Sequence, residues 1–249
     1  MKAMILAAGL GTRLRPLTND RPKALVEVGR HTLLEITLRR LLHFGVREVI
    51  VNVHHFADMV TDYLKKNDNF GIRIEISREE VLLDTGGGLK KAAWFFQEGS
   101  SNADEPFLLH NVDVISTIDL HRMLLSHRQK QALATLAVQK RETSRYLLFD
   151  DQNQLCGRRA GRDQEPEIVR PSARTQARAF SGIHVISPRL LSMIEEQGVF
   201  SIIPTYLRLA AQGKRILAFP ADEYYWRDLG KPENVVQASR DIEQKIVEV

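Results

Sequence analysis

Strand-like and helix-like segments alternate along the 249 residues, and this alternation constrains the fold more than any other feature. Residues 3–8 form a short, continuously apolar run that leads into glycines, which is typical of a buried parallel strand. Residues 32–44 carry leucines at helical spacing, and Gly45 follows as a common helix end. The pattern predicts an α/β fold with a Rossmann-like, mostly parallel or mixed sheet and helices on both of its faces.

The remaining segments continue the alternation without an internal repeat or a low-complexity linker. We expect further strands over residues 49–53, 73–77, 106–109, 132–138, 146–149, 180–186, 216–219 and 224–227. We expect further helices over residues 57–66, 87–97, 120–128, 188–196, 202–211 and 232–247. The sequence therefore predicts a single domain over 1–249, and sheets of this kind bind ligands beyond the carboxyl ends of their strands.

The composition indicates the cellular compartment of the protein and the class of molecule that it binds. A formal net charge of +4 with 27% charged residues suits a phosphorylated small molecule and does not require nucleic acid. Cys156 is the single cysteine, which excludes an internal disulfide framework and fits a reducing compartment. The apolar stretch at the N-terminus is too short for a signal peptide, and no apolar run approaches the roughly 20 residues that span a bilayer. We expect a cytoplasmic protein, a monomer or homodimer, with no nucleic-acid or membrane partner.

The loop after the first predicted strand combines glycines with basic side chains. Gly9 and Gly11 permit φ > 0 and a close approach, so successive backbone N–H groups can form a nest for a phosphate. Arg13 adds a planar, permanently charged fork, and Lys23 adds a point charge at the far end of the loop. Leu14 takes the place of the third glycine of a dinucleotide fingerprint, and no segment matches a P-loop. A glycine turn with scattered basic residues is the alternative interpretation.

The full pattern of this loop resembles the signature of the sugar-1-phosphate nucleotidyltransferase family. The matching residues are Leu6-x-Ala8-Gly9-x-Gly11-Thr12-Arg13-x-x-Pro16-Leu17-Thr18, followed by Pro22-Lys23. The resemblance implies that the loop wraps a triphosphate, that Arg13 binds the departing pyrophosphate and that Lys23 contacts the reacting phosphates. It also implies a fold of the nucleotide-diphospho-sugar transferase type, nucleotide-binding over about 1–115 and sugar-binding over about 116–249. The nucleotide contacts expected in the loop are Leu6, Ala7, Ala8, Gly9, Gly11, Thr12 and Arg13.

The resemblance further implies two metal-binding aspartates from distant parts of the chain. The matching motifs are Asn111-Val112-Asp113 and Trp226-Arg227-Asp228-Leu229-Gly230. Mg²⁺ takes hard oxygen ligands, usually one or two carboxylates with substrate phosphates and waters. We therefore expect Asp113 and Asp228 to hold Mg²⁺ and to form the catalytic set with Arg13 and Lys23, although each aspartate alone could be a cap or turn residue. Val112 stands where glycine is usual, and we expect its side chain to alter the shape of the site.

A glycine-rich segment before a predicted helix resembles the family's nucleobase loop. Thr85, Gly86 and Gly87 are expected to contact the nucleobase, because glycines let backbone groups approach it closely. A glycine-rich helix start is the alternative. The Thr-Gly-Gly-Gly form is similar to small single-domain members, among them the mannose- and heptose-1-phosphate guanylyltransferases and the N-acetylmuramate-1-phosphate uridylyltransferases.

The sugar side of the predicted site departs from the family pattern. Lys23, Asn111 and Gly182 are expected to bind the sugar phosphate, with Gly182 leaving room for the sugar; a core strand with an incidental glycine is the alternative. Many relatives carry a Glu-Lys-Pro element whose lysine holds the sugar phosphate, and it is missing here; residues 170–171, an Arg-Pro pair, are a candidate substitute. The arginine-rich stretch over 158–178 is either a solvated loop or hairpin, or a lid that gathers anionic substrate. Its arginines are Arg158, Arg159, Arg162, Arg170, Arg174 and Arg178.

Together these patterns predict a Mg²⁺-dependent enzyme that joins an NTP, with GTP or UTP favoured, to a sugar 1-phosphate and releases pyrophosphate. Mannose-1-phosphate guanylyl transfer is one example. A cytidylyltransferase for phosphocholine or a similar phosphate is the alternative among enzymes, since such proteins share the opening loop. A catalytically silent nucleotide-sugar-binding regulator is the alternative from another class, although a mere binder does not need the full reacting set.

Overall fold

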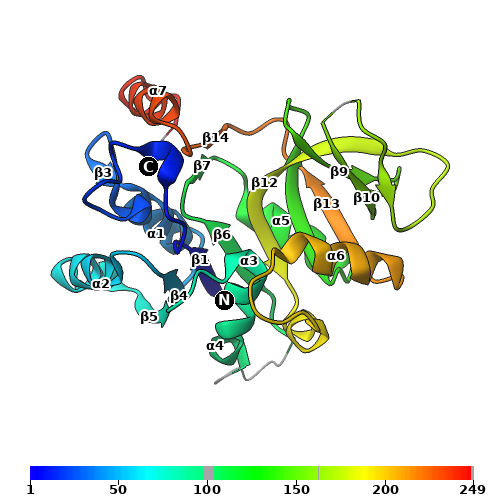
Figure 1. Cartoon of the computed structure of the whole chain (residues 1–249), viewed down its shortest axis with the longest axis horizontal. Coiled ribbons are helices and arrows are strands. Elements are labelled where there is room, and N and C mark those ends of the chain that lie inside the picture. The colour runs from blue at the N-terminus through cyan, green and yellow to red at the C-terminus, as the bar shows by residue number, and fades with distance from the viewer. Residues whose placement is uncertain (98–103, 162, 248–249) are drawn as a thin grey trace.

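In the part of the chain that is described, ten strands form one mixed sheet at the centre of the molecule (Figure 1). The structure is a computed structural model that describes residues 1–97, 104–161 and 163–247. The main strand order is β11 (Glu167–Ile168), β10 (Leu155–Ala160), β9 (Arg145–Phe149), β12 (Gln176–Ile186), β6 (Phe107–Asn111), β1 (Lys2–Leu6), β4 (Glu48–Val53) and β5 (Arg73–Arg78). In addition, β8 (Ala134–Gln139) pairs with β12, and β13 (Ile216–Pro220) pairs with β8.

The N-terminal part of the sheet is parallel, as the sequence predicts. Strand β1 pairs in parallel with β4 on one side and β6 on the other, and β4 pairs in parallel with β5. Because β1 is covered on both faces, Met4 and Ile5 are fully buried, which explains the continuous apolar run in the sequence. The carboxyl ends of β1, β4 and β6 therefore meet at one edge of the sheet.

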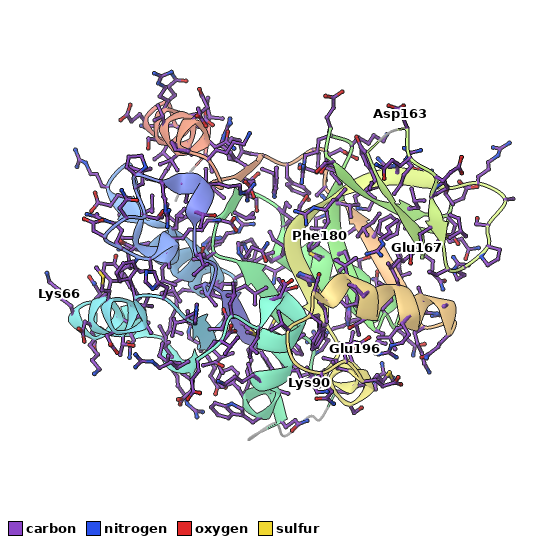
Figure 2. All side chains as sticks on the ribbon, viewed as in Figure 1. Lys66, Lys90, Asp163, Glu167, Phe180 and Glu196 are labelled. Atoms are coloured by element: carbon purple, nitrogen blue, oxygen red, sulfur yellow. The ribbon has the colours of Figure 1, made fainter. Side chains whose placement is uncertain are left out.

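Strand β12 joins the two parts of the sheet. Its C-terminal half pairs antiparallel with β6, and its N-terminal half pairs antiparallel with β9. The register with β8 shifts between Phe180 and His184, and Gly182 within this irregularity has φ +76°. Figure 2 shows Phe180 on this long strand, between the two parts of the molecule.

Helices cover both faces of the sheet, as the alternation predicts. One apolar core contains side chains of α1 (Leu33–His43), α2 (Ala57–Lys66), α5 (Leu120–Gln129) and α7 (Pro232–Glu243). The second contains side chains of α3 (Asp84–Lys91), α4 (Ala93–Gln97) and α6 (Ile202–Ala211). None of the helices in the described residues is long and apolar enough to cross a bilayer.

A small two-stranded sheet lies beside the main one. Strand β7 (Val114–Ser116) follows β6 almost directly and pairs antiparallel with β14 (Trp226–Asp228). This pairing returns the chain, more than a hundred residues later, to the carboxyl end of β6. A hairpin of β2 (Glu27–Val28) and β3 (His31–Thr32) packs against α7.

Most predicted elements occur close to their expected bounds, and four differ. The strand predicted over 180–186 begins four residues earlier, at Gln176. The helix predicted over 87–97 begins at Asp84 and is broken at Ala92 into α3 and α4. The helix predicted over 188–196 is instead a 3₁₀ helix, Pro188–Met193, which ends before the extended Ile194. Beyond its end, Lys90 Nζ donates to the carbonyl oxygens of Ile194 and Glu196 at 3.1 and 2.7 Å (Figure 2). The closing helix ends at Glu243 and not at residue 247.

Candidate active site

The opening loop folds back on itself directly after β1. Gly11 has φ +64°, and a Cβ atom there would lie 3.0 Å from Thr18 Cγ2 and 3.1 Å from Lys23 Cβ. The Thr18 hydroxyl donates to the Gly11 carbonyl oxygen at 2.9 Å, which fixes this fold-back. Glycine is therefore needed at 11 for backbone conformation and for space. Gly9 differs, because a Cβ atom there would meet nothing within 4 Å, so its backbone is open to a ligand.

Lys23 and Asp113, 90 residues apart in sequence, form an ion pair at this loop. Lys23 begins a short 3₁₀ helix, Lys23–Leu25, after the extended Pro22, and Asp113 lies between β6 and β7. Their side chains are only 11% and 14% exposed, so the pair is shielded from most solvent screening. The ammonium and the carboxylate that the motifs predicted are thus held next to each other.

Asp228 reaches the same place through backbone pairing. It pairs with Val114 in the β14–β7 ladder, and the next amide, Leu229 N–H, donates to the Asp113 carbonyl oxygen at 2.8 Å. The Asp228 carboxylate accepts from Gly230 N–H at 2.9 Å, and Asn234 Nδ2 donates to the Asp228 carbonyl oxygen at 2.8 Å. The two aspartates that the distant motifs predict as metal ligands are therefore brought next to each other by the backbone.

Arg13 completes this cluster. A Cβ atom on Gly230 would lie 2.7 Å from Asp228 Oδ1 and 2.8 Å from Arg13 Nη2, so guanidinium and carboxylate flank the same glycine. The motif's final glycine is explained by this crowding, since a side chain at 230 would displace one of the two groups. The structure brings together all four predicted catalytic residues, Arg13, Lys23, Asp113 and Asp228.

A buried polar network at the strand ends was not anticipated from the sequence. Asn52, in β4, accepts from Ala7 N–H at 2.7 Å and donates to Glu79 Oε1 at 2.7 Å. Glu79 is 2% exposed, and its other oxygen accepts from Leu83 N–H at 2.9 Å. The network fixes the backbone after β1 relative to the start of α3. An asparagine within an otherwise apolar strand is the sequence signal that could have indicated it.

The glycines of the predicted nucleobase loop pack closely against another segment. A Cβ atom on Gly86 would clash with the ring of Phe200, and one on Gly87 would lie 2.5 Å from the Gly198 carbonyl oxygen. The Thr85 hydroxyl accepts from Ile202 N–H at 3.0 Å. Protein packing is thus sufficient to require glycine at 86 and 87, and the contact of Thr85, Gly86 and Gly87 with a nucleobase stays a prediction.

Asn111 and Gly182, which the family resemblance assigns to the sugar phosphate, are neighbours in the structure. A Cβ atom on Gly182 would lie 2.9 Å from Asn111 Nδ2, so the positive φ and the crowding both favour glycine. The next carbonyl towards the N-terminus, that of Ser181, accepts from Trp226 Nε1 at 2.8 Å. The bent part of β12 is thereby attached to the strand that carries Asp228.

Two expectations for this side are wrong. Val112 does not alter the site with its side chain, which is 3% exposed and belongs to the apolar core. Arg170 does not replace the missing lysine, because it pairs with Asp150 and donates from Nε to the Leu155 carbonyl oxygen at 3.3 Å. Asp150 follows the end of β9 that pairs with Gln176, whereas Ala179, closer to Gly182, pairs with Tyr146 near the other end of β9. Arg170 is therefore bound away from Gly182.

The arginine-rich stretch is largely a hairpin extension of the sheet. Strands β10 and β11 belong to it, and Arg158 pairs with Glu167 at 2.6 Å. Arg162 lies outside the described residues. The hairpin interpretation thus holds for this part of the stretch, and a lid is not needed to explain it.

Arg141 is a basic residue near the cluster that sequence patterns missed. Its guanidinium carbon lies 3.8 Å from the centroid of the Trp226 ring, and its Nη2 donates to the Phe180 carbonyl oxygen at 2.7 Å. Burial lowers the pKa of Arg141, while the nearby negative charge of Asp228 opposes this shift. No motif marks Arg141, because its place in the site depends on packing between residues far apart in the chain.

Comparison with known proteins agrees with this geometry. Residues 2–245 match the nucleotidyl transferase family. The chain is 35% identical over 242 residues to N-acetylmuramate alpha-1-phosphate uridylyltransferase of Caulobacter vibrioides, covering 93% of this chain and 92% of that protein. It is 32% identical to mannose-1-phosphate guanyltransferase beta-B of Xenopus laevis, covering 94% of this chain but only 62% of that protein.

The fold has close counterparts among solved structures. HddC from Yersinia pseudotuberculosis, crystallised with GMP-PN, superposes with a TM-score of 0.74 at 22% identity, covering 97% of this chain and 99% of that one. At this identity the likeness concerns the fold alone. Taken with the sequence matches and the assembled site, it leads to one conclusion: the chain belongs to the nucleotidyl transferase family and is a sugar-1-phosphate nucleotidyltransferase.

Proposed function

We propose that the enzyme transfers a nucleoside monophosphate from GTP or UTP to a sugar 1-phosphate in a Mg²⁺-dependent reaction that releases pyrophosphate. The observation that carries this proposal is the convergence of Arg13, the Lys23–Asp113 ion pair and Asp228 at the carboxyl end of β6. Positive and negative groups alternate there, as is needed to hold phosphates and a cation together.

The donor set fits Mg²⁺. Asp113 and Asp228 supply carboxylate oxygens from adjoining strands, and no group of three or more His, Cys, Asp or Glu side chains occurs among the described residues. Two carboxylates completed by substrate phosphates and waters form a common Mg²⁺ site. A bound Mg²⁺ would neutralise phosphate charge and favour in-line displacement at the nucleotide's α-phosphorus.

The chain's own residues would chiefly position the substrate phosphates and neutralise their negative charge. A sugar 1-phosphate is largely dianionic at neutral pH and is already a nucleophile, so the proposal includes no general base. In the proposed reaction Lys23 contacts the reacting phosphates, and Arg13 binds the departing pyrophosphate, which accumulates negative charge. Preorganised cations in a shielded site stabilise such charge effectively.

Arg141 is the cation that we assign to the sugar phosphate in place of the missing lysine. It lies against Trp226, two residues before Asp228, and its Nε is buried without a hydrogen-bond partner among the described residues. An orphaned buried donor of this kind is costly unless a ligand satisfies it. A phosphate oxygen is the partner that its charge favours.

The test is pyrophosphate release with Mg²⁺, each NTP and a panel of sugar 1-phosphates that includes mannose and N-acetylmuramate derivatives. We expect turnover with GTP or UTP and at least one sugar 1-phosphate. Turnover only with CTP and phosphocholine would instead identify a cytidylyltransferase. Tight nucleotide binding without pyrophosphate from any pair would identify a regulator, and either result contradicts the proposal.

A further inference from the structure

A cavity of about 410 Å³ lies beside β12, outside the cluster of catalytic residues. It is lined by Lys140, Arg141, Glu142, Tyr146, Arg159 and Ala177. These residues come from β9, β10, β12 and the segment after β8. Three cationic side chains face one carboxylate, so the cavity carries a net positive charge and suits an anion.

The cavity adjoins the proposed acceptor site through Arg141. Besides lining the cavity, Arg141 is stacked on the Trp226 ring, and its Nη2 donates to the Phe180 carbonyl oxygen. Phe180 is two residues from Gly182, at most about 7 Å along an extended strand. A hexose bound near Gly182 therefore has substituents within reach of the cavity.

Arg159 is held in place before any ligand binds. Its Nε donates to the Gly161 carbonyl oxygen at 3.1 Å, and its guanidinium lies 5.7 Å from the centroid of the Tyr146 ring. The backbone of Lys140 is fixed as well, since its N–H donates to Asp222 Oδ1 at 2.5 Å. A guanidinium that is already held, as that of Arg159 is, loses little conformational entropy when it binds a ligand. Ala177, with a small side chain, leaves the space between them open.

The phosphates of the proposed reaction do not account for these two cations. Arg13 and Lys23 lie at the aspartates and do not line the cavity, and among the lining residues it is Arg141 that contacts Trp226, close to Asp228 in sequence. We infer that the acceptor is a sugar 1-phosphate with a second anionic group, a carboxylate, which Lys140 and Arg159 bind in this cavity. A neutral hydroxyl group would not require two cations, whereas a guanidinium matches a carboxylate in shape and charge. The inference rests on the proposed function and names the substrate class of the same site.

Two matched pairs of acceptors test the inference in the intact enzyme. Glucuronate 1-phosphate differs from glucose 1-phosphate by a carboxylate, and N-acetylmuramate 1-phosphate differs from N-acetylglucosamine 1-phosphate by a lactyl group. We expect kcat/KM to be about tenfold or more higher for the acidic member of at least one pair, because a hydrogen bond to a charged group contributes that much. This advantage should shrink as salt rises. Equal or better use of both neutral members would overturn the inference.

Substitutions in the cavity distinguish recognition of the acceptor's carboxylate from a loss of activity that is the same for all acceptors. Arg159→Gln and Lys140→Gln should each lower the ratio of acidic to neutral kcat/KM, Arg159→Gln by about tenfold, and Arg159→Lys should restore part of it. Arg158→Gln is the matched control, because Arg158 pairs with Glu167 on the opposite face of β10 and should leave the ratio unchanged. A loss that is equal for acidic and neutral acceptors would show that the cavity does not recognise the carboxylate.

Failure of the proposed function would look different. No pyrophosphate from any acceptor with any NTP would contradict nucleotidyl transfer itself. Calorimetric titration with glucuronate 1-phosphate and glucose 1-phosphate would then still decide the inference. Tighter binding of the acidic compound that Arg159→Gln abolishes would support it, and equal binding would overturn it.

Discussion

The two glycines of the opening loop differ in what a side chain would meet. Gly11 has positive φ and is crowded by Thr18 and Lys23, whereas Gly9 has open space around it. The first is therefore a requirement of the fold, and the second is available for a ligand. The motif alone does not distinguish these roles, since both positions are simply glycine in the sequence.

Gly11→Ala should destabilise the protein by about 1–2 kcal/mol, because alanine is strained at positive φ and its Cβ atom would press on Thr18. Gly9→Ala should change the free energy of unfolding by less than about 0.5 kcal/mol. It should nevertheless raise KM for the NTP, because the methyl group occupies the proposed phosphate approach. Chemical denaturation and steady-state kinetics of both variants check this. Equal destabilisation would contradict the distinction.

Residues identified by a motif were predictable, and residues placed by tertiary packing were not. Asp113 and Asp228 stand in recognisable patterns, so their meeting could be expected. Asn52 and Arg141 have no such pattern, because their roles depend on partners such as Glu79 and Trp226, which are 27 and 85 residues away. Arg170 is an example of a pattern that misleads. The Arg-Pro pair resembled the missing Glu-Lys-Pro element, but the Arg170 side chain is bound to Asp150.

Among the elements, β14 is attached to α7 through the carboxylate of Asp241. Asp241 in α7 accepts from Tyr225 Oη at 2.6 Å, from Gln237 Nε2 at 2.8 Å and from Arg227 at 2.9 Å. Burial of Asp241 would raise its pKa, but the hydrogen bonds from Tyr225 and Gln237 and the charge of Arg227 together hold it below its usual value. This connection places β14, and with it Asp228, against β7.

Asp241→Asn should destabilise the protein by about 1–3 kcal/mol, because Arg227 loses its buried counter-charge. It should also raise the Mg²⁺ concentration needed for half-maximal rate, since Asp228 is less firmly held. Thermal unfolding and a Mg²⁺ titration measure both effects. Asp151→Asn, at an exposed turn, is a suitable control that should change neither. An unaltered Mg²⁺ dependence in a destabilised Asp241→Asn protein would remove the link between α7 and the metal site.

Element types were largely predictable, and their breaks were not. Helix α2 matches its expected range of 57–66, because its periodicity alone determines it. The helical periodicity of the sequence does not mark the break at Ala92 or the 3₁₀ helix Pro188–Met193, beyond which Lys90 binds the 194–196 backbone. The antiparallel pairing of β12 with β6 is likewise a long-range contact that local sequence does not specify.

At the scale of the whole molecule, three buried histidines link stability to pH. Burial lowers the pKa of His110 and His127 to about 4 and that of His184 to about 3. Nearby cationic groups add to the first two shifts, and His110 adds to the third. The neutral forms are therefore part of the folded protein. His184 binds the Tyr206 hydroxyl at 2.8 Å, and His127 binds Thr135 and Ser187.

Stability should fall as the pH drops from about 6.5 towards 4, because over this range the unfolded chain binds protons at these histidines and the folded chain does not. Each such histidine contributes up to roughly 1.4 kcal/mol per pH unit. Denaturation by urea at pH 7, 6 and 5 measures the slope, and His184→Gln should reduce it. A free energy of unfolding that stays constant over this range would contradict the linkage.

The proposed nucleotidyl transfer requires Asp113 and Asp228 to form one Mg²⁺ site with Lys23 and Arg13. The most direct measurement is the rate of Mg²⁺-dependent pyrophosphate release by Asp113→Asn beside the wild-type enzyme, with folding monitored by thermal unfolding. We expect the variant to keep its fold and to react at least about a hundredfold more slowly, because it lacks a carboxylate ligand where phosphate charge must be neutralised. A folded Asp113→Asn protein with a near-normal rate would contradict the account.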